Sequence, residues 1–142
     1  MTIKIKLDEG AYMPHRAHKA DAGADLFSPV EAIVYPGCHA TIDTGVHMEI
    51  PFGYKGVIMS KSGLLRHYGI ITTGLVDSGY TGEIGVTLIN TGNDPYVVKK
   101  GQKIAQITIE PVVLCDFEIS DKLADSERGA NGFGSTGIFW EG

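Results

Sequence analysis

The amino-acid sequence predicts an all-β domain, folded as a sandwich or a barrel. Apolar and polar residues alternate with a period of two in several stretches, which is typical of half-buried strands. Turn-forming residues separate these stretches at intervals of about 8–12 residues, which favours many short strands. Helical patterning is scarce, and we expect one short helix over residues 62–68, with Ser60 or Ser62 near its N-cap.

Three stretches show the clearest alternation, at residues 3–7, 46–50 and 105–109. Their apolar side chains would point to one face of a sheet and their polar side chains to the other. Further β-prone runs lie at residues 33–34, 57–59, 86–89 and 112–114. The turn signals between them lie at residues 36–37, 51–53, 90–95 and 100–101.

The composition indicates one domain and excludes several classes of protein. The chain has 142 residues, 43% of them hydrophobic, which suits a single domain with a core. A net charge of −5 argues against a broad face for duplex nucleic acid. No stretch approaches the roughly 20 apolar residues of a membrane helix. The N-terminal residues lack the apolar core of a signal peptide, so we expect a cytoplasmic protein.

The cysteines and the C-terminal residues complete this outline. Cys38 and Cys115 match no metal-binding spacing, and we expect two buried, free thiols in a reducing compartment. Residues 1–120 are expected to form the core of the domain. Residues 121–142 change from charged to glycine-rich, so we expect an arm that stays mobile until a contact orders it.

Two segments in the first half of the chain suit a metal or a phosphate. Asp25 lies beside a turn of small residues at 20–28. Lys61, Ser62 and Gly63 lie at a strand-to-helix junction, where a cation and backbone N–H groups suit a phosphate. Taken alone, these segments are better explained as an aspartate-capped turn and an ordinary helix start, and no Walker sequence is present.

Three later segments complete the set. Residues 74–82 are predicted to form a β-hairpin with Asp77 and Tyr80 near its turn, which makes Asp77 a candidate general base. Residues 99–106 form a lysine-rich turn that leads into a strand. Residues 128–137 place Arg128 and Phe133 among glycines and hydroxyls, as a phosphate clamp with a stacking aromatic ring would. Taken alone, each also fits a plain turn, hairpin or disordered tail.

In this order, the five segments resemble the motifs of the trimeric dUTPase family. Residues 22–28 resemble motif one, and residues 60–64 resemble motif two. The sequences GLVDSGYTG, GQKIAQ and RGANGFGSTG, at residues 74–82, 101–106 and 128–137, are similar to motifs three, four and five. The resemblance therefore spans nearly the whole chain.

The resemblance implies a distorted β jelly-roll barrel with a mobile C-terminal arm that assembles as a homotrimer. One subunit would supply motifs one, two and four to each active site, a second motif three, and a third its arm. The implied reaction is Mg²⁺-dependent hydrolysis of dUTP to dUMP and pyrophosphate, by water attack at the α-phosphorus. This reaction limits uracil incorporation into DNA and supplies dUMP for dTMP synthesis.

The resemblance also implies a role for each matching residue. Asp77 would be the catalytic base, and Asp25 would contact Mg²⁺ through water, because Mg²⁺ keeps most of its waters. Tyr80 would lie under the deoxyribose, and Phe133 would stack on uracil. The expected phosphate contacts are Lys61, Ser62, Gly63, Gln106, Arg128, Gly134, Ser135 and Thr136. The expected nucleoside contacts are Leu75, Val76, Asp77, Tyr80, Gly85 and Phe133.

Four positions depart from the family pattern. Lys61 and Lys103 stand where motifs two and four usually have arginine, so a point charge replaces a bidentate fork. Gln102 stands where an acid is usual, and Asn131 replaces a glycine of motif five. Asparagine tolerates positive φ better than most residues, so the arm can still fold over a ligand.

Two other functions remain open from the sequence. A dUTPase-like chain can act also, or instead, by binding a regulatory protein partner. A dCTP deaminase shares the fold, but it needs a glutamate on the strand after the hairpin, and residues 84–90 hold none there, with Thr87 near that position. Beyond motif five, Phe139 and Trp140 are expected to pack the arm on a neighbouring subunit.

Overall fold

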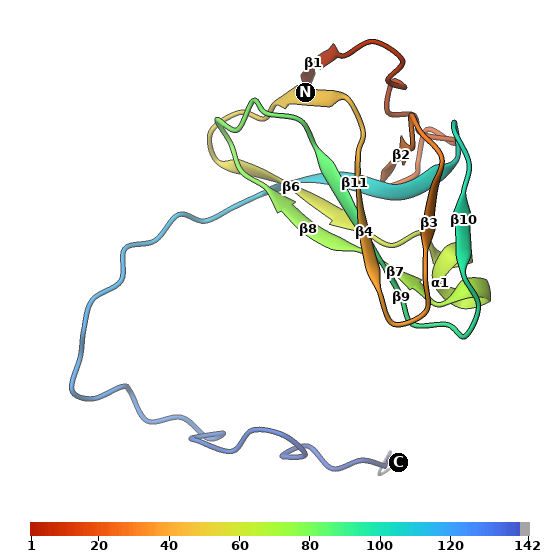
Figure 1. Ribbon diagram of the computed structural model, residues 1–142. Helices are drawn as coiled ribbons and strands as arrows, with labels where there is room; N and C mark the ends of the chain where they lie inside the picture. Colours follow the sequence, from red (N-terminus) through yellow and green to blue (C-terminus); the bar gives the residue numbers. More distant parts are fainter. Residues whose placement is uncertain (140–142) are drawn as a thin grey trace.

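The computed structural model describes residues 1–139 and consists mainly of antiparallel strands (Figure 1). The elements in chain order are β1 (Lys4–Leu7), β2 (Ala24–Phe27), β3 (Ala32–Val34), β4 (His39–Asp43), β5 (Val46–Glu49), β6 (Tyr54–Met59), α1 (Ser62–Tyr68), β7 (Ile70–Ile71), β8 (Thr73–Val76), β9 (Gly85–Asn90), β10 (Tyr96–Val98) and β11 (Lys103–Pro111). The all-β prediction is therefore confirmed. No helix within residues 1–139 is long and apolar enough to cross a membrane.

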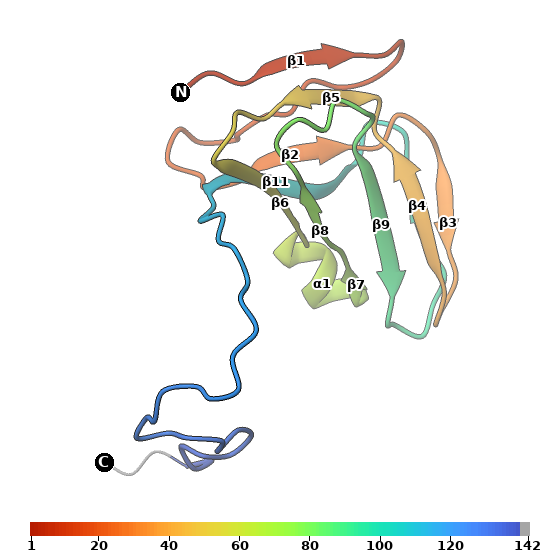
Figure 2. The ribbon, with the colours of Figure 1, turned by 90° about the vertical axis from the view of Figure 1, so that its left-hand side faces the viewer.

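The strands form four sheets, with the orders β1-β5, β10-β3, β2-β11-β6-β8 and β4-β9-β7. Many neighbours in these sheets lie far apart in sequence, such as β2 and β11, as the crossing connections of a jelly roll require. Figure 2 shows the sheets β2-β11-β6-β8 and β4-β9-β7 on different sides of the molecule. The fold is a jelly roll, distorted because its strands are divided among separate sheets.

One hydrophobic core holds these sheets together. Leu26 and Ile104 from one sheet, and Val86 and Leu88 from another, are fully buried and belong to a single apolar cluster. Buried and less buried residues alternate along β9, as the period of two predicts. The three alternating stretches of the sequence lie on β1, β5 and β11, so their prediction as strands is confirmed.

A β-bulge near the start of β11 affects the candidate site. The register with β2 pairs Lys103 with Phe27 and Gln106 with Asp25. Phe27 and Asp25 are two positions apart and share a face, whereas residues three positions apart in a regular strand do not. The extra residue of the bulge therefore brings Lys103 and Gln106 to the same face as Asp25.

The predicted helix is confirmed, and its N-cap lies between the two serines, although neither serine caps it. The N-cap residue is Lys61, and no side chain caps the helix by a hydrogen bond. The Ser60 hydroxyl is engaged elsewhere, since it donates to the Thr72 carbonyl at 3.0 Å and accepts from the Thr72 N–H at 2.8 Å. The helix ends at Gly69, whose φ of 68° is a left-handed conformation that favours glycine.

Two strand predictions are wrong. Residues 74–82 do not form a hairpin, because β8 pairs with β6 whereas β9 pairs with β4 and β7. Residues 77–84 instead connect two sheets, and this connection is longer than a hairpin loop of about two to five residues. The β-prone run at 112–114 does not extend β11, which ends at Pro111, because the chain leaves the sheet there and meets no partner strand.

The predicted burial of the cysteines is wrong. Cys38 and Cys115 are free, as expected, but both are exposed. Cys38 lies in the turn between β3 and β4, and Cys115 lies in the chain after β11. From residue 112 to residue 139 the chain has no helix or strand and extends away from the sheets (Figure 1). Trp140, expected to pack the arm, lies outside the described residues.

Candidate functional site

A cluster of charged and polar side chains lies where β2, β11 and the end of β6 meet. Asp25 is only 6% exposed, and each of its carboxylate oxygens accepts a hydrogen bond from a lysine. Lys61 binds Oδ1, and the Nζ of Lys103 lies 2.7 Å from Oδ2. Gln106 donates to the carbonyl of Ser60 at 3.1 Å. The structure thus brings the predicted site residues Asp25, Lys61 and Gln106 together. Lys103, which was not predicted as a site residue, joins them.

The electrostatics of this cluster favour an anion. Burial would raise the pKa of Asp25, but hydrogen bonds from Lys103 and Lys61 outweigh burial and lower that pKa below its ordinary value. Asp25 is therefore ionised at neutral pH. One carboxylate beside two ammonium groups leaves the cluster with a net positive charge, which attracts a phosphate and repels a free metal ion.

The backbone approaches the cluster closely at Gly23 and is exposed at the start of α1. A Cβ on Gly23 would lie 2.6 Å from Oε1 of Gln106, so a glycine is required there for the Gln106 amide to keep its position. Ser62 and Gly63 follow Lys61 at the start of α1, and both are exposed. The exposed backbone and hydroxyl next to Lys61 are thus accessible from solvent.

A second candidate site is a pocket beside the connection between β8 and β9. Its volume is about 430 Å³. It is lined by most of the predicted nucleoside-binding residues, namely Leu75, Val76, Asp77, Tyr80 and Gly85. Glu83 and Thr87 also line it. The sequence motif did not single out Glu83 as a pocket residue, because its position depends on how residues 77–84 fold back between the sheets.

The connection holds Tyr80 in place and leaves Asp77 open to water. The Tyr80 hydroxyl donates to the Glu83 carbonyl at 2.9 Å, and the Tyr80 N–H donates to the Asp77 carbonyl at 3.3 Å. A Cβ on Gly82 would lie 2.5 Å from the Tyr80 hydroxyl oxygen, so a glycine is needed there. Asp77 is exposed at the pocket, where its carboxylate can accept a proton from a water molecule.

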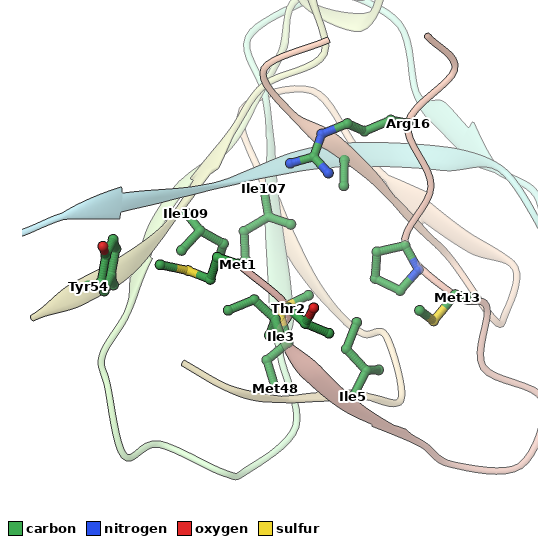
Figure 3. Close-up of a pocket in the computed structure, with 12 residues that line it drawn as sticks. Met1, Thr2, Ile3, Ile5, Met13, Arg16, Met48, Tyr54, Ile107 and Ile109 are labelled. Atoms are coloured by element: carbon green, nitrogen blue, oxygen red, sulfur yellow. The ribbon is translucent and has the colours of Figure 1, made fainter. Parts of the chain in front are cut away.

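A larger cavity lies elsewhere and does not carry this chemistry. It measures about 560 Å³ and is formed around the N-terminal residues (Figure 3). Its lining is Met1, Thr2, Ile3, Ile5, Met13, Pro14, Arg16, Ala24, Met48, Tyr54, Ile107 and Ile109. The lining contains no carboxylate, histidine or cysteine, so this cavity is not the candidate active site.

The lysine cluster and the Asp77 pocket lie at opposite ends of the β6–β8 pair. Val76, directly before Asp77, pairs with Gly56 near the start of β6. Lys61 follows the other end of β6. At about 3.4 Å per residue, the backbones of Asp77 and Lys61 are roughly 20 Å apart. A single chain therefore does not place both side chains around one phosphorus atom.

The predicted contacts of the arm lie apart from both sites. Arg128, Phe133, Gly134, Ser135 and Thr136 are all exposed on the segment that extends from the sheets (Figure 1). Within residues 128–137 the hydrogen bonds are local, and the Arg128 Nε donates to the carbonyl of Asn131 at 3.1 Å. The structure thus brings these residues neither to Asp25 nor to Asp77.

These features define a class of protein: a jelly-roll protein with a cationic cluster and a separate, water-accessible carboxylate pocket. A family model described as dUTPase matches residues 9–137. Because this match covers most of the chain, the chain belongs to the dUTPase family.

Individual relatives agree with this assignment. The deoxyuridine 5'-triphosphate nucleotidohydrolase of Clostridium tetani is 47% identical over 140 residues, which cover 96% of this chain and 97% of that protein. The dUTPase of Staphylococcus bacteriophage 80alpha, solved with dUpNHpp, is 32% identical, with a TM-score of 0.91 over 96% of this chain and 99% of that chain. A mutant dUTPase of phage phi11 of S. aureus, whose structure reveals details of the coordination of a structural Mg(II) ion, is 29% identical, with a TM-score of 0.80 over 86% of this chain and 98% of that chain.

Proposed function

We propose that the chain is a Mg²⁺-dependent dUTP diphosphatase, which hydrolyses dUTP to dUMP and pyrophosphate. The observation that carries this proposal is the pocket that contains Leu75, Val76, Tyr80 and Gly85 beside the exposed carboxylate of Asp77. The reaction matches the name that the curated relatives share. In a cell, it would limit uracil incorporation into DNA and supply dUMP for dTMP synthesis. A cytoplasmic location is part of the proposal.

Asp77 acts as the general base in this proposal. The water that attacks the α-phosphorus must lose a proton as the new P–O bond forms, and pyrophosphate leaves with the electrons of the broken bond. A carboxylate within hydrogen-bond reach of that water accepts the proton. The exposure of Asp77 at the pocket supports this role, because water reaches the carboxylate without displacing another side chain.

The lysine cluster binds the phosphates. Lys61, Ser62, Gly63 and Gln106 are the proposed contacts from the body of the protein, and Arg128, Gly134, Ser135 and Thr136 are those from the arm. The net positive charge around Asp25 supports binding of a polyphosphate. Closure of the arm would exclude water and strengthen each charge interaction with the phosphates.

The nucleoside lies in the pocket next to Asp77. Backbone groups between Leu75 and Gly85 would distinguish uracil from cytosine, because the donor and acceptor at position 4 of the base are exchanged. Tyr80, held by its bond to the Glu83 carbonyl, would lie under the deoxyribose and exclude a 2'-hydroxyl. Phe133 would stack on the uracil ring, which stabilises such complexes by roughly 1–3 kcal/mol.

A homotrimer with shared sites is part of the proposal. The separation of Asp77 from Lys61 supports it, because a second subunit must then supply one half of each site. The chain after β11 also exposes Val113, Phe117 and Ile119, whose apolar side chains a neighbouring subunit can cover. A third subunit would contribute the arm with Arg128 and Phe133.

The residues present fit Mg²⁺ only as an ion that arrives with the triphosphate. Within residues 1–139, no group of three or more His, Cys, Asp and Glu side chains is close enough to hold a metal. Both oxygens of Asp25 already accept hydrogen bonds from lysines, so the carboxylate would contact Mg²⁺ through a water molecule and not directly. Proteins commonly bind Mg²⁺ through one or two carboxylates together with substrate phosphates. When bound, the ion would neutralise charge on the phosphates.

The alternative of a dCTP deaminase is disfavoured by the pocket itself. Thr87 lines the pocket, and its hydroxyl lies 2.8 Å from the hydroxyl of Thr41. A threonine hydroxyl does not perform the proton transfers that a glutamate performs in deamination. Hydrolysis therefore remains the better proposal.

A regulatory role is a second candidate function. Phage dUTPases such as that of bacteriophage 80alpha control transfer of virulence genes by a proto-oncogenic G protein-like mechanism. This chain shares their fold at 32% identity. A regulatory protein partner would therefore bind this chain in addition to dUTP or instead of it.

The decisive experiment measures pyrophosphate release from dUTP, dCTP, dTTP and UTP in parallel, with and without Mg²⁺. We expect release from dUTP alone, and only with Mg²⁺. Equal turnover of all four nucleotides would contradict the proposed selectivity. Ammonia release from dCTP would favour the deaminase, and no reaction with any nucleotide would favour a purely regulatory protein.

A further inference from the structure

The His47 side chain joins strand β1 to the connection that carries Asp77. Its Nε2 lies 2.9 Å from Oδ2 of Asp8, which follows β1. Its Nδ1 lies 2.9 Å from the carbonyl oxygen of Thr81, next to Tyr80. The His47 side chain is 18% exposed, so the ring is largely shielded from water.

Both partners of His47 are hydrogen-bond acceptors. The Thr81 carbonyl only accepts, and an ionised Asp8 carboxylate only accepts. A neutral imidazole has one N–H, so it can donate to one of these oxygens but leaves a lone pair opposite the other. Two hydrogen bonds at these distances therefore require the doubly protonated imidazolium.

We propose that His47 is a positioning residue for the connection of residues 77–84, and that it acts only as the imidazolium. The proton on Nδ1 fixes the Thr81 carbonyl, and the proton on Nε2 anchors the ring to Asp8. The effect on catalysis rests on the proposed function, because Asp77 and Tyr80 lie on the segment that His47 holds.

The position of Thr81 matters because the connection has few other anchors to β5. The Gly45 N–H donates to Oε1 of Glu83 at 2.6 Å, and the Ile84 N–H donates to the Val46 carbonyl at 2.9 Å. Both anchors lie on the β9 side of Thr81. The bond from His47 is thus the anchor nearest to Tyr80 among these contacts, and its loss frees the stretch that reaches back to Asp77.

The charged groups around His47 favour its protonation on balance. The hydrogen bonds that His47 donates to Asp8 and to the Thr81 carbonyl raise the pKa of His47 above its ordinary value, while partial burial and Lys6 oppose them. The pKa of Asp8 is lowered in return, chiefly by its hydrogen bond to His47. The remaining titratable groups on the packed elements are Lys4 and Glu49, which pair with each other, and Asp77, Tyr80 and Glu83 on the connection.

The direction of the pH effect follows from the raised pKa of His47. The imidazolium and its two bonds are fully present below the pKa of an unfolded histidine, about 6.5. They are lost as the pH rises through the higher pKa of the folded state. The connection should therefore loosen as the pH rises through the folded-state pKa of His47, and binding of the nucleoside should weaken with it.

The first arm of the test needs no activity. The full-length protein is titrated by NMR, following the His47 ring and the Thr81 and Gly82 amides, in the wild type, in Asp8→Asn and in the matched control His67→Gln. We expect a His47 pKa above the ordinary histidine value of about 6.5, co-titration of the Thr81 and Gly82 signals, and a lower His47 pKa in Asp8→Asn. An ordinary His47 pKa, or Thr81 and Gly82 signals that ignore the titration, would overturn the inference.

The second arm measures the pH profile of kcat/KM for dUTP. The wild type should lose efficiency above the His47 pKa through a roughly two- to tenfold rise in KM, as the loss of one hydrogen bond predicts. His47→Gln should show the raised KM at all pH values and lack this inflection, whereas His67→Gln should retain it. A wild-type inflection that persists in a folded His47→Gln variant would overturn the inference. If the wild type hydrolyses no dUTP, the proposed function fails, and the NMR arm alone decides the role of His47.

Discussion

Lys103 donates a hydrogen bond to Oδ2 of Asp25 at 2.7 Å, across the two strands that the β-bulge of β11 brings into register. Lys103 stands where the family usually has arginine, and its neighbour Gln102 stands where an acid is usual. Gln102 instead accepts from the backbone N–H of Lys99 at 2.9 Å and binds the Tyr96 hydroxyl. The charge of Lys103 is therefore directed to Asp25 and not to residue 102.

Replacing Asp25 by asparagine should destabilise the fold at neutral pH, and this destabilisation should become smaller in acid. The variant loses two charge-assisted hydrogen bonds, and we expect a loss of about 1–3 kcal/mol in the free energy of unfolding. Because the pKa of folded Asp25 is lowered, its stabilisation is present above the unfolded pKa of about 3.9 and disappears as the pH falls through the folded pKa. Urea unfolding at pH 7 and in a series below pH 4 measures the difference.

The matched control is Asp116→Asn, on the exposed chain after β11. It should leave the free energy of unfolding within about 0.5 kcal/mol of the wild type. A difference between wild type and Asp25→Asn that stays constant from pH 7 into strong acid would show that the lysine pairs do not stabilise the fold.

Replacing Asp77 by asparagine should strongly slow hydrolysis while preserving nucleotide binding. The amide has nearly the same shape as the carboxylate but cannot accept the proton of the attacking water. The turnover should fall by about 10²- to 10⁴-fold. Pyrophosphate release gives the rate, and calorimetry with a non-hydrolysable dUTP analogue gives the affinity. Asp94→Asn, on the loop before β10, is the control and should retain full turnover; a comparable rate in Asp77→Asn would assign the base elsewhere.

Removing residues 121–142 should reduce turnover without unfolding the jelly roll. The last strand ends at Pro111, and the side chains of residues 112–139 are mostly exposed in this structure. Phe133→Ala tests the arm more finely, because loss of a base stack worth roughly 1–3 kcal/mol should raise KM about 5- to 150-fold. Steady-state kinetics and circular dichroism together measure both effects. Unchanged kinetics of the truncated chain would exclude a role for the arm.

Truncating a core side chain should cost far more than truncating one on the arm. Leu88 is fully buried between the sheets, so Leu88→Ala should lower the free energy of unfolding by about 2–5 kcal/mol. Leu123 is 81% exposed, and Leu123→Ala should change that free energy by less than about 0.5 kcal/mol. Urea denaturation of the two variants provides the comparison, and similar losses would contradict the packing described for β9.

The fold was largely predictable because its strands alternate clearly. Period-two patterning located β1, β5 and β11, and the scarcity of helical pattern left only α1. Strand pairing was less predictable, because residues 74–82 look locally like a hairpin although β8 and β9 belong to different sheets. The partner of a strand depends on contacts from distant parts of the chain, which local propensity does not encode.

The candidate site was predictable in its residue types but not in its geometry. The motifs identified Asp25 and Asp77, but the pairing of Asp25 with Lys103 depends on a bulge that has no clear signal in the sequence. The contact of His47 with Thr81 joins residues 34 positions apart and likewise needed the folded chain. Exposure of Cys38 followed from its place in a turn, where the apolar character of the thiol does not decide burial.

The separation of Asp77 from Lys61 along the β6–β8 pair has a genetic consequence under the proposed trimer. A cell with two alleles, one encoding Asp77→Asn and the other a chain that lacks the arm, would build mixed assemblies. In such a mixed trimer, some active sites would combine an intact Asp77 from one variant with an intact arm from the other, and other sites would contain both defects. This arrangement predicts that co-expression of the two variants partly restores activity. Each purified variant kept separate should show no such recovery.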